Sequence, residues 1–443
     1  MSVTSTGSES ESAQSKSPTS SGLVANPQNG DGTGSNFQLS DSAPQIHDIP
    51  SGISTIDPSE LADLIANYGN STSTAWLEKE RYRTWRPSPS PTSKSSFPPV
   101  QGYLEANGWV FAWGSPIISD RSALKPTAEA FIRWVSSQDL RPVFCCVDVE
   151  LEEILAGMGW STVSCINEDV IDPEHVIELT MGGEDVEVNN GTTGMVKDLK
   201  KNLRRAERAN VQVEEVKRED MGDEVKKELA EGIEAWKKSR SGLQLAATSF
   251  DPWLDFEHRR YWVARVDTKA VGIIILTPVQ DSYVIKNAVS FPKAPKGTSE
   301  ALIFTALKDL RDERASGNTD DVDQTDRQAD QGQSQSQNNG AAEDSDKAQQ
   351  EASHRRDSRT GHMSVTFSIS AAGDLKPTKN VSGWKFTWLN KTYSNVSQGT
   401  GLLNRSDFRS KFDSEREPMF VCYPTEDGFG LDGIETLLKL LRR

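Results

Sequence analysis

The sequence predicts a mixed α/β fold in which helices cover both sides of a sheet. Apolar segments with strand character, "GWVFAWGSPII" at 108–118 and "RPVFCCVDVE" at 141–150, alternate with amphipathic helical segments. Between residues 202 and 372 the expected order is helix, strand, helix, three strands, helix and strand. This order favours a mixed sheet with helices on either side.

The first half is expected to begin with a helix at 58–68, which has Pro58 in its first turn. Its apolar residues follow the i, i+3, i+4, i+7 spacing of one helical face: Leu61, Leu64, Ile65 and Tyr68. The strand at 108–118, a helix at 127–140 and the strand at 141–150 come next. A strand, a helix and a second strand in this order predict one α/β layer.

The second half is expected to begin with a helix at 195–210, a strand at 211–216 and a helix at 225–240. Three strands then lie within 259–291, with turns at 267–269 and 280–281. A helix follows at 297–314, with acidic Glu300 in its first turn, where negative charge suits the helix dipole. A strand resumes at 362–373, and the apolar face of 434–443 is expected to dock on the core.

Two tracts contain few of the apolar residues that a folded core needs. Residues 1–53 are rich in Ser, Thr, Gly, Asn and Asp, and residues 317–360 in Gln, Asp and Ser. Such segments cannot offset the entropy of ordering, so we predict a disordered tail and a disordered acidic insert. Nine acidic and two basic residues lie between Asp320 and Glu351, so nearly half of the net charge of −16 belongs to the insert.

The composition argues against several classes of protein. The four cysteines show no paired spacing and are expected to be reduced, buried thiols. The five histidines are scattered, which predicts no metal site. No apolar run approaches the roughly 20 residues of a membrane span, and the N-terminus lacks the features of a signal or transit peptide. We therefore expect a cytoplasmic protein.

A concentrated basic segment, "VKDLKKNLRRAERAN" at 196–210, is unusual in so acidic a chain. Six of the twelve residues from 197 to 208 are basic, and helical spacing places all six on one face. This face is either ordinary solvated surface or a phosphate-binding surface, because Lys and Arg neutralise phosphates and release counterions. An anionic membrane surface is a further candidate partner. The candidate phosphate-binding residues are Lys197, Lys200, Lys201, Arg204, Arg205 and Arg208.

Four motifs follow one another in the second half: "KDLKKNLRRAERANVQVEEV", "GIEAWKKSR", "GIIILTP…NAVSFPKAPKGTSEALI" and "FRSKFDSEREPMFVCYP". Together they resemble the C-terminal domain of lysyl-phosphatidylglycerol synthases. Members of that family look like tandem acetyltransferase-type (GNAT) folds that transfer an amino acid from aminoacyl-tRNA to a lipid hydroxyl. In the first half, "GNSTSTAWLEKERYRTWRPS" and "YLEANGWVFAWGSPIIS" are similar to fungal ergosteryl aminoacyl-ester synthases.

The resemblance implies two GNAT-like domains, at 54–190 and at 191–316 with 361–443. Nothing in the chain resembles the aspartyl-tRNA synthetase that is fused to the aspartate-transferring relatives. The chain is therefore similar to the free-standing branch, which implies glycine transfer from glycyl-tRNA to the 3β-hydroxyl of ergosterol. The expected co-substrate is aminoacyl-tRNA, with no cofactor, and any contact with a membrane or lipid droplet would be peripheral.

The segment "APKGTSEAL" lies where a coenzyme A-dependent GNAT carries Q/R-x-x-G-x-G/A before a helix. Gly297 is present, but Ala294 and Ser299 depart from that pattern. The departure disfavours the alternative of an acyl-CoA N-acyltransferase. Lys293 and Lys296 are candidates to hold a phosphate at this helix N-terminus, or they are ordinary surface lysines.

Transfer from an aminoacyl ester needs no Ser or Cys nucleophile, because the donor is already activated. The protein must supply proximity and stabilise the tetrahedral oxyanion. Lys411 matches the family's Lys-Phe motif and is the candidate charge stabiliser, with Arg405 six residues earlier. The alternative for Lys411 is an ion pair with Asp413 or Glu415. His258 is a candidate general base or a surface residue.

The remaining candidates would line a substrate groove, and each has a structural alternative. Trp236 and Arg240 lie in "IEAWKKSR", where the tryptophan also suits the core. Glu300 would bind an amine or cap its helix. Trp384 and Trp388 in "GWKFTWLNKTYSN" would line an apolar slot for a sterol or form the core of a hairpin. A non-catalytic RNA- or membrane-binding module on the same fold is a further alternative.

Overall fold

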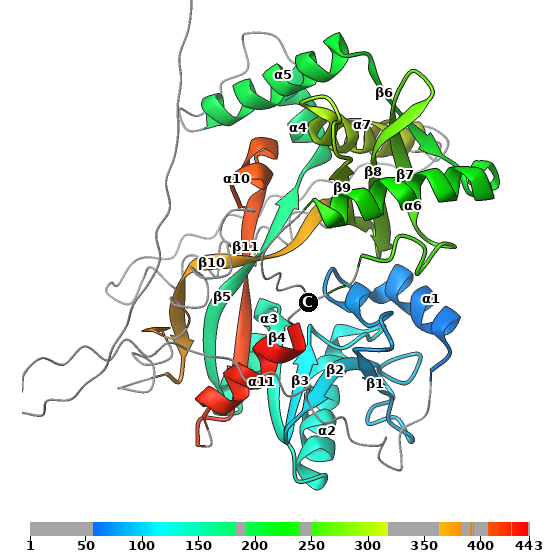
Figure 1. Cartoon of the computed structure of the whole chain (residues 1–443). Helices are drawn as coiled ribbons and strands as arrows, with labels where there is room; N and C mark the ends of the chain where they lie inside the picture. Colours follow the sequence, from blue (N-terminus) through cyan, green and yellow to red (C-terminus); the bar gives the residue numbers. More distant parts are fainter. Residues whose placement is uncertain are drawn as a thin grey trace, which may run out of the picture. The chain divides into compact units, whose positions relative to one another are not determined.

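A computed structural model describes residues 56–181, 192–239, 248, 250–317, 363–381, 390, 391, 393, 406–426 and 428–441 (Figure 1). The predicted tail at 1–53 and almost all of the acidic insert at 317–360 lie outside these residues. The predicted domain boundaries stay a prediction.

The described elements fall into two series along the chain. The first series is α1 (Pro58–Tyr68), β1 (Arg83–Trp85), β2 (Gln101–Ala106), β3 (Trp109–Trp113), α2 (Leu124–Ser137), β4 (Arg141–Val147), α3 (Val149–Gly157), β5 (Ser161–Ile171) and α4 (Pro173–Met181). The second series is α5 (Thr192–Arg208), β6 (Val211–Val216), α6 (Asp223–Lys238), β7 (Arg260–Val266), β8 (Lys269–Val279), β9 (Ser282–Ser290), α7 (Thr298–Gly317), β10 (Val365–Lys379), α10 (Ser406–Arg409), β11 (Glu415–Tyr423) and α11 (Leu431–Leu441). Short 3-10 turns are η1 (Ser73–Ala75), η2 (Arg121–Ala123), η3 (Arg218–Asp220) and η5 (Ser410–Phe412).

Most sequence-predicted elements are confirmed within a few residues, with β6 at its predicted bounds. The strand predicted at 108–118 ends earlier, because β3 stops at Trp113 and the chain turns at Gly114, which has φ 77°. The strand predicted from 362 is longer than expected, since β10 continues to Lys379.

All described strands belong to one eleven-stranded sheet, in the order β1-β2-β3-β4-β11-β5-β10-β9-β8-β7-β6. Each outer part of the sheet repeats one plan: antiparallel strands, a helix and a parallel strand. In one part α2 leads to β4, which is parallel to β3; in the other α7 leads to β10, which is parallel to β9. The repeat confirms the predicted tandem GNAT-like α/β fold.

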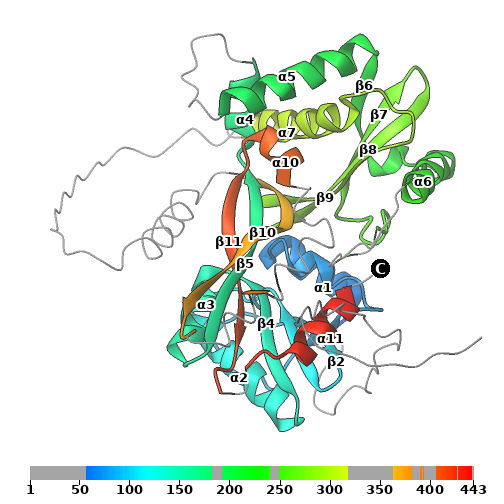
Figure 2. The same ribbon diagram turned by 60° about the vertical axis from the view of Figure 1, so that its left-hand side comes forward.

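The two series exchange strands at the centre of the sheet. β11, from the end of the chain, lies between β4 and β5, and β5, from the first series, pairs with β10 of the second. Figure 2 shows β5, β10 and β11 crossing between the two series. Each part of the sheet is therefore completed by a strand that is distant in sequence.

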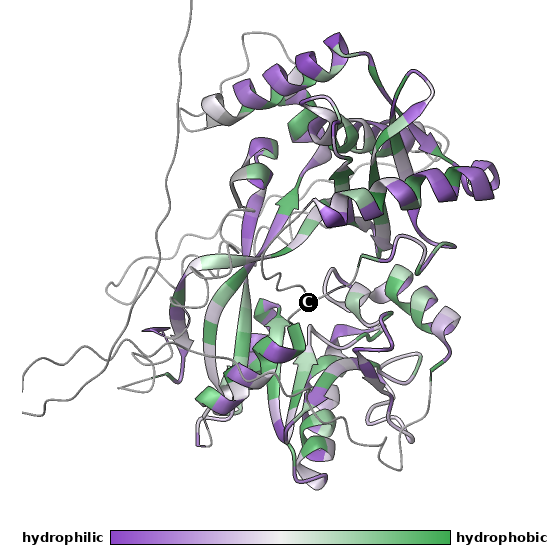
Figure 3. Cartoon of the chain, viewed as in Figure 1, coloured by the Kyte–Doolittle hydropathy of each residue, from purple (hydrophilic) through white to green (hydrophobic). Residues whose placement is uncertain are grey.

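Helices cover both faces of the sheet, as predicted. Around β7–β9, one face packs in a cluster with Leu199 of α5 and Leu302 of α7, and the other face packs in a cluster with Leu229 and Ile233 of α6. Figure 3 shows hydrophilic and hydrophobic residues alternating along α5. The basic helix therefore lies on the face opposite α6.

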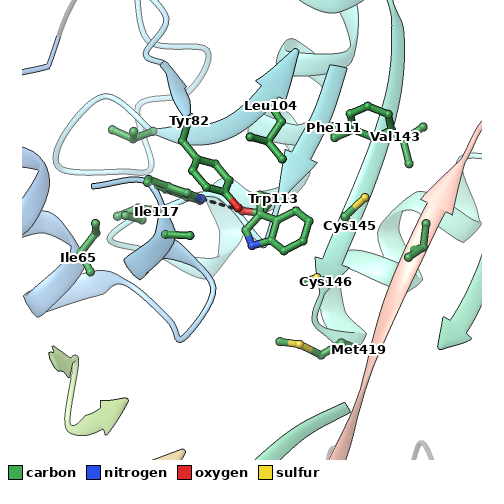
Figure 4. Close-up of a cluster of buried hydrophobic side chains, with 14 of the residues drawn as sticks. Ile65, Tyr82, Leu104, Phe111, Trp113, Ile117, Val143, Cys145, Cys146 and Met419 are labelled. Atoms are coloured by element: carbon green, nitrogen blue, oxygen red, sulfur yellow. Dashed lines mark hydrogen bonds between the residues drawn. The ribbon is translucent and has the colours of Figure 1, made fainter. Parts of the chain in front are cut away.

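In the first series, a buried cluster joins α1 to the sheet. Ile65 of α1 packs with Trp113, Ile117 and Cys145 (Figure 4). Trp76 donates its indole N–H to the carbonyl oxygen of Trp113 at 2.9 Å. α11 contacts β2 and β3, and its Ile434 packs on this cluster, which confirms that the C-terminal helix docks on the core.

Candidate functional site

The candidate site lies where the backbone pairing of β9 and β10 ends. This parallel pair comprises two positions, Val365 opposite Tyr283 and Thr366 opposite Val284. Just beyond them β9 has a bulge, since Ile275 is opposite Asn287 but Leu276 is opposite Ile285. Lys286 is the extra residue of this bulge. Unpaired strand edges and bulges of this kind redirect side chains and are common beside active sites.

The N-terminus of α7 lies directly against α5. Gly297 has φ 96°, and a Cβ atom built on it would lie 2.1 Å from the backbone oxygen of Asn202. In both views α5 and α7 lie side by side (Figures 1 and 2). Since α5 occupies the space beside Gly297, the loop where a coenzyme-dependent GNAT would hold a pyrophosphate is packed against protein.

Lys411 is held by a buried carboxylate at this helix junction. Its Nζ donates to Oε1 of Glu300 at 2.8 Å, and the same oxygen accepts from Nδ2 of Asn202 at 2.9 Å. Glu300 is 6% exposed. The partner of Lys411 is Glu300 and not Asp413 or Glu415, the two alternatives from the sequence, because the turn that carries Lys411 packs against α5, which lies beside α7. Glu300 therefore binds an amine of the protein itself, the side chain of Lys411.

Arg409, two residues before Lys411, fixes this turn to the centre of the sheet. Its Nη1 donates to Oδ2 of Asp169 in β5 at 2.5 Å and to the carbonyl oxygens of Ser368 and Ile369 in β10 at 3.2 and 3.3 Å. Asp169 is 1% exposed. Sequence reasoning did not single out Arg409, although it lies within the quoted "FRSKF" motif; its partner in β5 is 240 residues away.

The predicted amphipathic arrangement of α5 is confirmed. Val196, Leu199 and Ala206 are buried, and Leu203 packs on the same cluster. Five of the six basic residues, all but half-buried Lys200, are exposed. No ion pair joins any of the six to a carboxylate among the described residues. Within the described part of the chain, the one side-chain hydrogen bond of these six residues runs from Arg205 Nη1 to Asn202 Oδ1, at 3.0 Å.

His258 lies away from Lys411, between α1 and the loop before β7. Its Nδ1 is 2.8 Å from Oδ1 of Asp255, and its Nε2 is 3.0 Å from Oδ1 of Asp63 in α1. Burial lowers the pKa of His258, but the two carboxylates outweigh burial and raise it overall. Both ring nitrogens are thus engaged, which favours an imidazolium that joins two elements over a free base.

The other predicted site residues are dispersed. Lys293 and Lys296 are exposed in the loop before α7. Trp236 packs in the core cluster beneath α6, with its ring centroid 5.5 Å from that of Phe250. Arg405, Arg240, Trp384 and Trp388 lie outside the described residues, so their roles stay predictions.

The described part of the chain also shows how possible metal ligands and thiols are arranged. Its His, Cys, Asp and Glu side chains form no group of three or more that could hold a metal ion. All four cysteines are buried and unpaired with one another. Burial raises the pKa of the Cys165 thiol to about 12. In addition, none of the described helices combines the length and apolar character needed to cross a bilayer.

The family comparison matches the phosphatidylglycerol lysyltransferase C-terminal model over residues 103–317. Two solved structures have similar folds. A C-terminal domain assigned as a lysylphosphatidylglycerol synthetase from Agrobacterium fabrum is 13% identical, with 86% of this chain and 95% of that chain covered and a TM-score of 0.57. L-PGS from Bacillus licheniformis is 12% identical, with 87% and 95% covered and a TM-score of 0.57. A comparison with curated proteins finds no match.

These findings define the class of protein: a tandem GNAT-like fold of the kind found in lysylphosphatidylglycerol synthase C-terminal domains. The family match supports the family that the sequence motifs indicated, and the two structures show the same fold.

Proposed function

We propose that this protein is a tRNA-dependent aminoacyltransferase that esterifies the hydroxyl of a membrane lipid. The observation that carries this proposal is the basic face of α5, whose six cations form no ion pair with the described carboxylates. Cations left unpaired on one helix face suit phosphates along a nucleic-acid backbone. The family match to a phosphatidylglycerol lysyltransferase domain supports the lipid acceptor.

The packing at the N-terminus of α7 supports an aminoacyl-tRNA donor over acyl-coenzyme A. A pyrophosphate at a helix N-terminus needs backbone N–H groups that it can approach closely. Here the backbone oxygen of Asn202 lies beside Gly297, and Lys411 and Glu300 form an ion pair in the first turn of the helix. The acyl-CoA alternative predicts coenzyme A binding in calorimetry, and the proposal predicts none.

Glycine and ergosterol are the finer part of the proposal and rest on the sequence resemblance to the free-standing fungal branch. We propose glycyl-tRNA as the donor and the 3β-hydroxyl of ergosterol as the acceptor. The protein would be cytoplasmic, with peripheral contact to a membrane or lipid droplet. Phosphatidylglycerol is the second acceptor to test, because the matching family model is a phosphatidylglycerol lysyltransferase.

The experiment is a lipid-labelling assay with the purified full chain. The protein is incubated with tRNA charged with radiolabelled glycine and with vesicles containing either ergosterol or phosphatidylglycerol, and the extracted lipids are separated by thin-layer chromatography. We expect a labelled lipid that disappears when the tRNA is first digested with RNase. Other aminoacyl-tRNAs in the same assay test the choice of glycine. If no charged tRNA labels either lipid, lipid aminoacylation is wrong.

A further inference from the structure

Arg259, the residue directly before β7, is a buried arginine in which two of the three guanidinium nitrogens have no hydrogen-bond partner in the described structure. The residue is 2% exposed. Its Nη1 donates to the backbone oxygen of Asp251 at 2.6 Å. Its Nε and Nη2 have no hydrogen-bond partner in the described structure. Buried donors without partners are rare in folded proteins, so each one calls for a functional or solvent explanation.

The two unused nitrogens belong to the same edge of the guanidinium. Nε and Nη2 point their N–H groups in parallel, and this edge binds the oxygens of carboxylate, phosphate or a developing oxyanion with two hydrogen bonds. Burial lowers the pKa of Arg259, although nearby Tyr261 and the carboxylates of Asp255, Asp251 and Glu78 oppose that effect. Arg259 remains a cation at neutral pH because an arginine pKa starts far above it.

A second unpaired donor, Thr277 of β8, lies on the same row of the sheet. Thr277 is 1% exposed, and its Oγ1 has no hydrogen-bond partner in the described structure. Arg260 is opposite Leu276 in the first β7–β8 pair, and continuing this register by one position beyond the end of the strand places Arg259 opposite Thr277. Antiparallel neighbours in one register position project their side chains to the same face.

The residues opposite Thr277 on the neighbouring strands lead to the candidate site. Thr277 is opposite Val284 of β9, and Val284 is opposite Thr366 in the last pair that joins β9 to β10. The bulge at Lys286 follows directly. Arg259 and Thr277 are therefore on the row of the sheet at which β9 and β10 stop pairing.

The two cations of the turn before β11 are hydrogen-bonded to carboxylates. Lys411 donates to Glu300, and Arg409 donates to Asp169. Their donors are therefore engaged before any substrate arrives. The Nε/Nη2 edge of Arg259 has no such hydrogen-bonded partner in the described structure. Electrostatic catalysis depends on donors that are fixed in place and not already used.

We propose that Arg259 and Thr277 are the donors that stabilise the oxyanion of the tetrahedral intermediate in acyl transfer. The ligand class is a tetrahedral oxygen anion of single charge, because the nearby carboxylates of Asp255, Asp251 and Glu78 would repel a more highly charged anion more strongly. The sequence predicts Lys411 for this role, and Arg259 is not among the candidates from the sequence. The inference rests on the proposed aminoacyl transfer.

The step conserves atoms and electrons. The acceptor hydroxyl oxygen forms a bond to the carbonyl carbon of the aminoacyl ester, and the carbonyl π electrons move onto its oxygen. Arg259 and Thr277 donate hydrogen bonds to this oxyanion. When the carbonyl reforms, the bond from carbon to the ribose oxygen breaks, and that oxygen takes up the proton released by the acceptor hydroxyl. No cofactor or redox partner takes part.

Thr277→Val is the first test, because the substitution keeps the shape of the side chain and removes a buried hydroxyl that makes no hydrogen bond. The fold therefore loses no hydrogen bond. We expect an unchanged or raised Tm, a kcat that falls roughly 10²- to 10³-fold, and an unchanged KM for aminoacyl-tRNA. Thr127→Val is the matched control. Thr127 in α2 is also fully buried with an unpaired hydroxyl, but it lies in the first series and away from β7–β9.

A binding experiment separates this inference from the proposed function. In adenosine 3′-(aminomethyl)phosphonate, the singly charged phosphonate group is a tetrahedral mimic of the intermediate formed from a glycyl ester. We expect it to raise the Tm of the wild-type protein and to bind at least about 10-fold more weakly to Thr277→Val and about 100-fold more weakly to Arg259→Met. Loss of binding in these variants supports the site even where no lipid becomes labelled. Equal binding to wild type and both variants, with an unchanged kcat for Thr277→Val, indicates an internal water only and overturns the inference.

Discussion

Lys411 and Glu300, 111 residues apart in sequence, form an ion pair of 2.8 Å at the junction of α5, α7 and the turn before β11. The carboxylate is almost fully buried, whereas the lysine is partly exposed, with 26% of its side chain accessible. The pair therefore has a structural role, since a buried carboxylate depends on its partners.

The double variant Lys411→Met/Glu300→Gln tests how much of the role of Lys411 is structural. Lys411→Met alone leaves Glu300 buried without its cation and is expected to lower the free energy of unfolding by about 1–3 kcal/mol. Adding Glu300→Gln removes the buried charge and should restore most of that stability in urea denaturation. If transfer activity returns with stability, Lys411 acts through the fold; if stability returns and activity does not, Lys411 touches the substrate.

The fold could be predicted from the sequence where local patterns decide it. The spacing of Val196, Leu199 and Ala206 predicts the buried face of α5, and the polar residues at 267–269 predict the β7–β8 turn. The exchange of β5 and β11 could not be predicted, because it depends on pairing between strands about 250 residues apart. The same limit applies to the site. Lys411 lies in a motif that can be seen in the sequence, whereas the unpaired donors of Arg259 are visible only in the three-dimensional structure.

The basic face of α5 should govern the salt dependence of RNA binding. Replacing Lys200, Lys201, Arg204 and Arg205 with Gln removes four positive charges that form no ion pair with described carboxylates. We expect weaker tRNA binding, and a plot of log K against log salt whose slope becomes shallower by about 0.7–0.9 for each phosphate that the helix no longer neutralises. Filter binding at several salt concentrations measures this slope.

A matched control for that variant uses exposed lysines outside α5. Lys227, Lys237 and Lys238 of α6, with Lys269 of β8, are exposed, and their replacement with Gln changes the net charge by the same amount. We expect the control to retain nearly the wild-type slope. Equal slopes for the α5 variant and the wild type would remove α5 from the RNA surface.

His258 should make stability depend on pH near neutrality. Asp255 and Asp63 raise the pKa of His258 in the folded protein above its ordinary value of 6.5, against the lowering effect of burial. A raised folded pKa means that the stabilisation is fully present below about pH 6.5 and is lost as pH rises through the folded pKa. Thermal unfolding of the wild type and His258→Gln between pH 5.5 and 8.5 measures it. We expect the difference in Tm to shrink as pH rises, and Asp63→Asn to reduce it. A difference that is constant with pH would contradict this account.

Gly297 should tolerate no side chain, because two constraints act on it at once. Its φ of 96° is unfavourable for any residue with a Cβ atom, and that atom would lie 2.1 Å from the backbone oxygen of Asn202. Gly297→Ala must therefore move α5 away from α7. We expect the free energy of unfolding to fall by about 3 kcal/mol or more, together with weaker tRNA binding as the basic helix shifts.

Gly108→Ala separates the two constraints on Gly297. Gly108, in the β2–β3 turn, has φ 78°, but a Cβ atom there meets no other atom within 4 Å. Its substitution carries the backbone strain alone, which costs about 1–2 kcal/mol. Because the turn is distant in sequence from α5 and makes no close approach to it, tRNA affinity should be unchanged. If Gly297→Ala costs no more than Gly108→Ala in urea denaturation, α5 is not held against the α7 N-terminus, and the argument that this packing excludes a coenzyme pyrophosphate loses its basis.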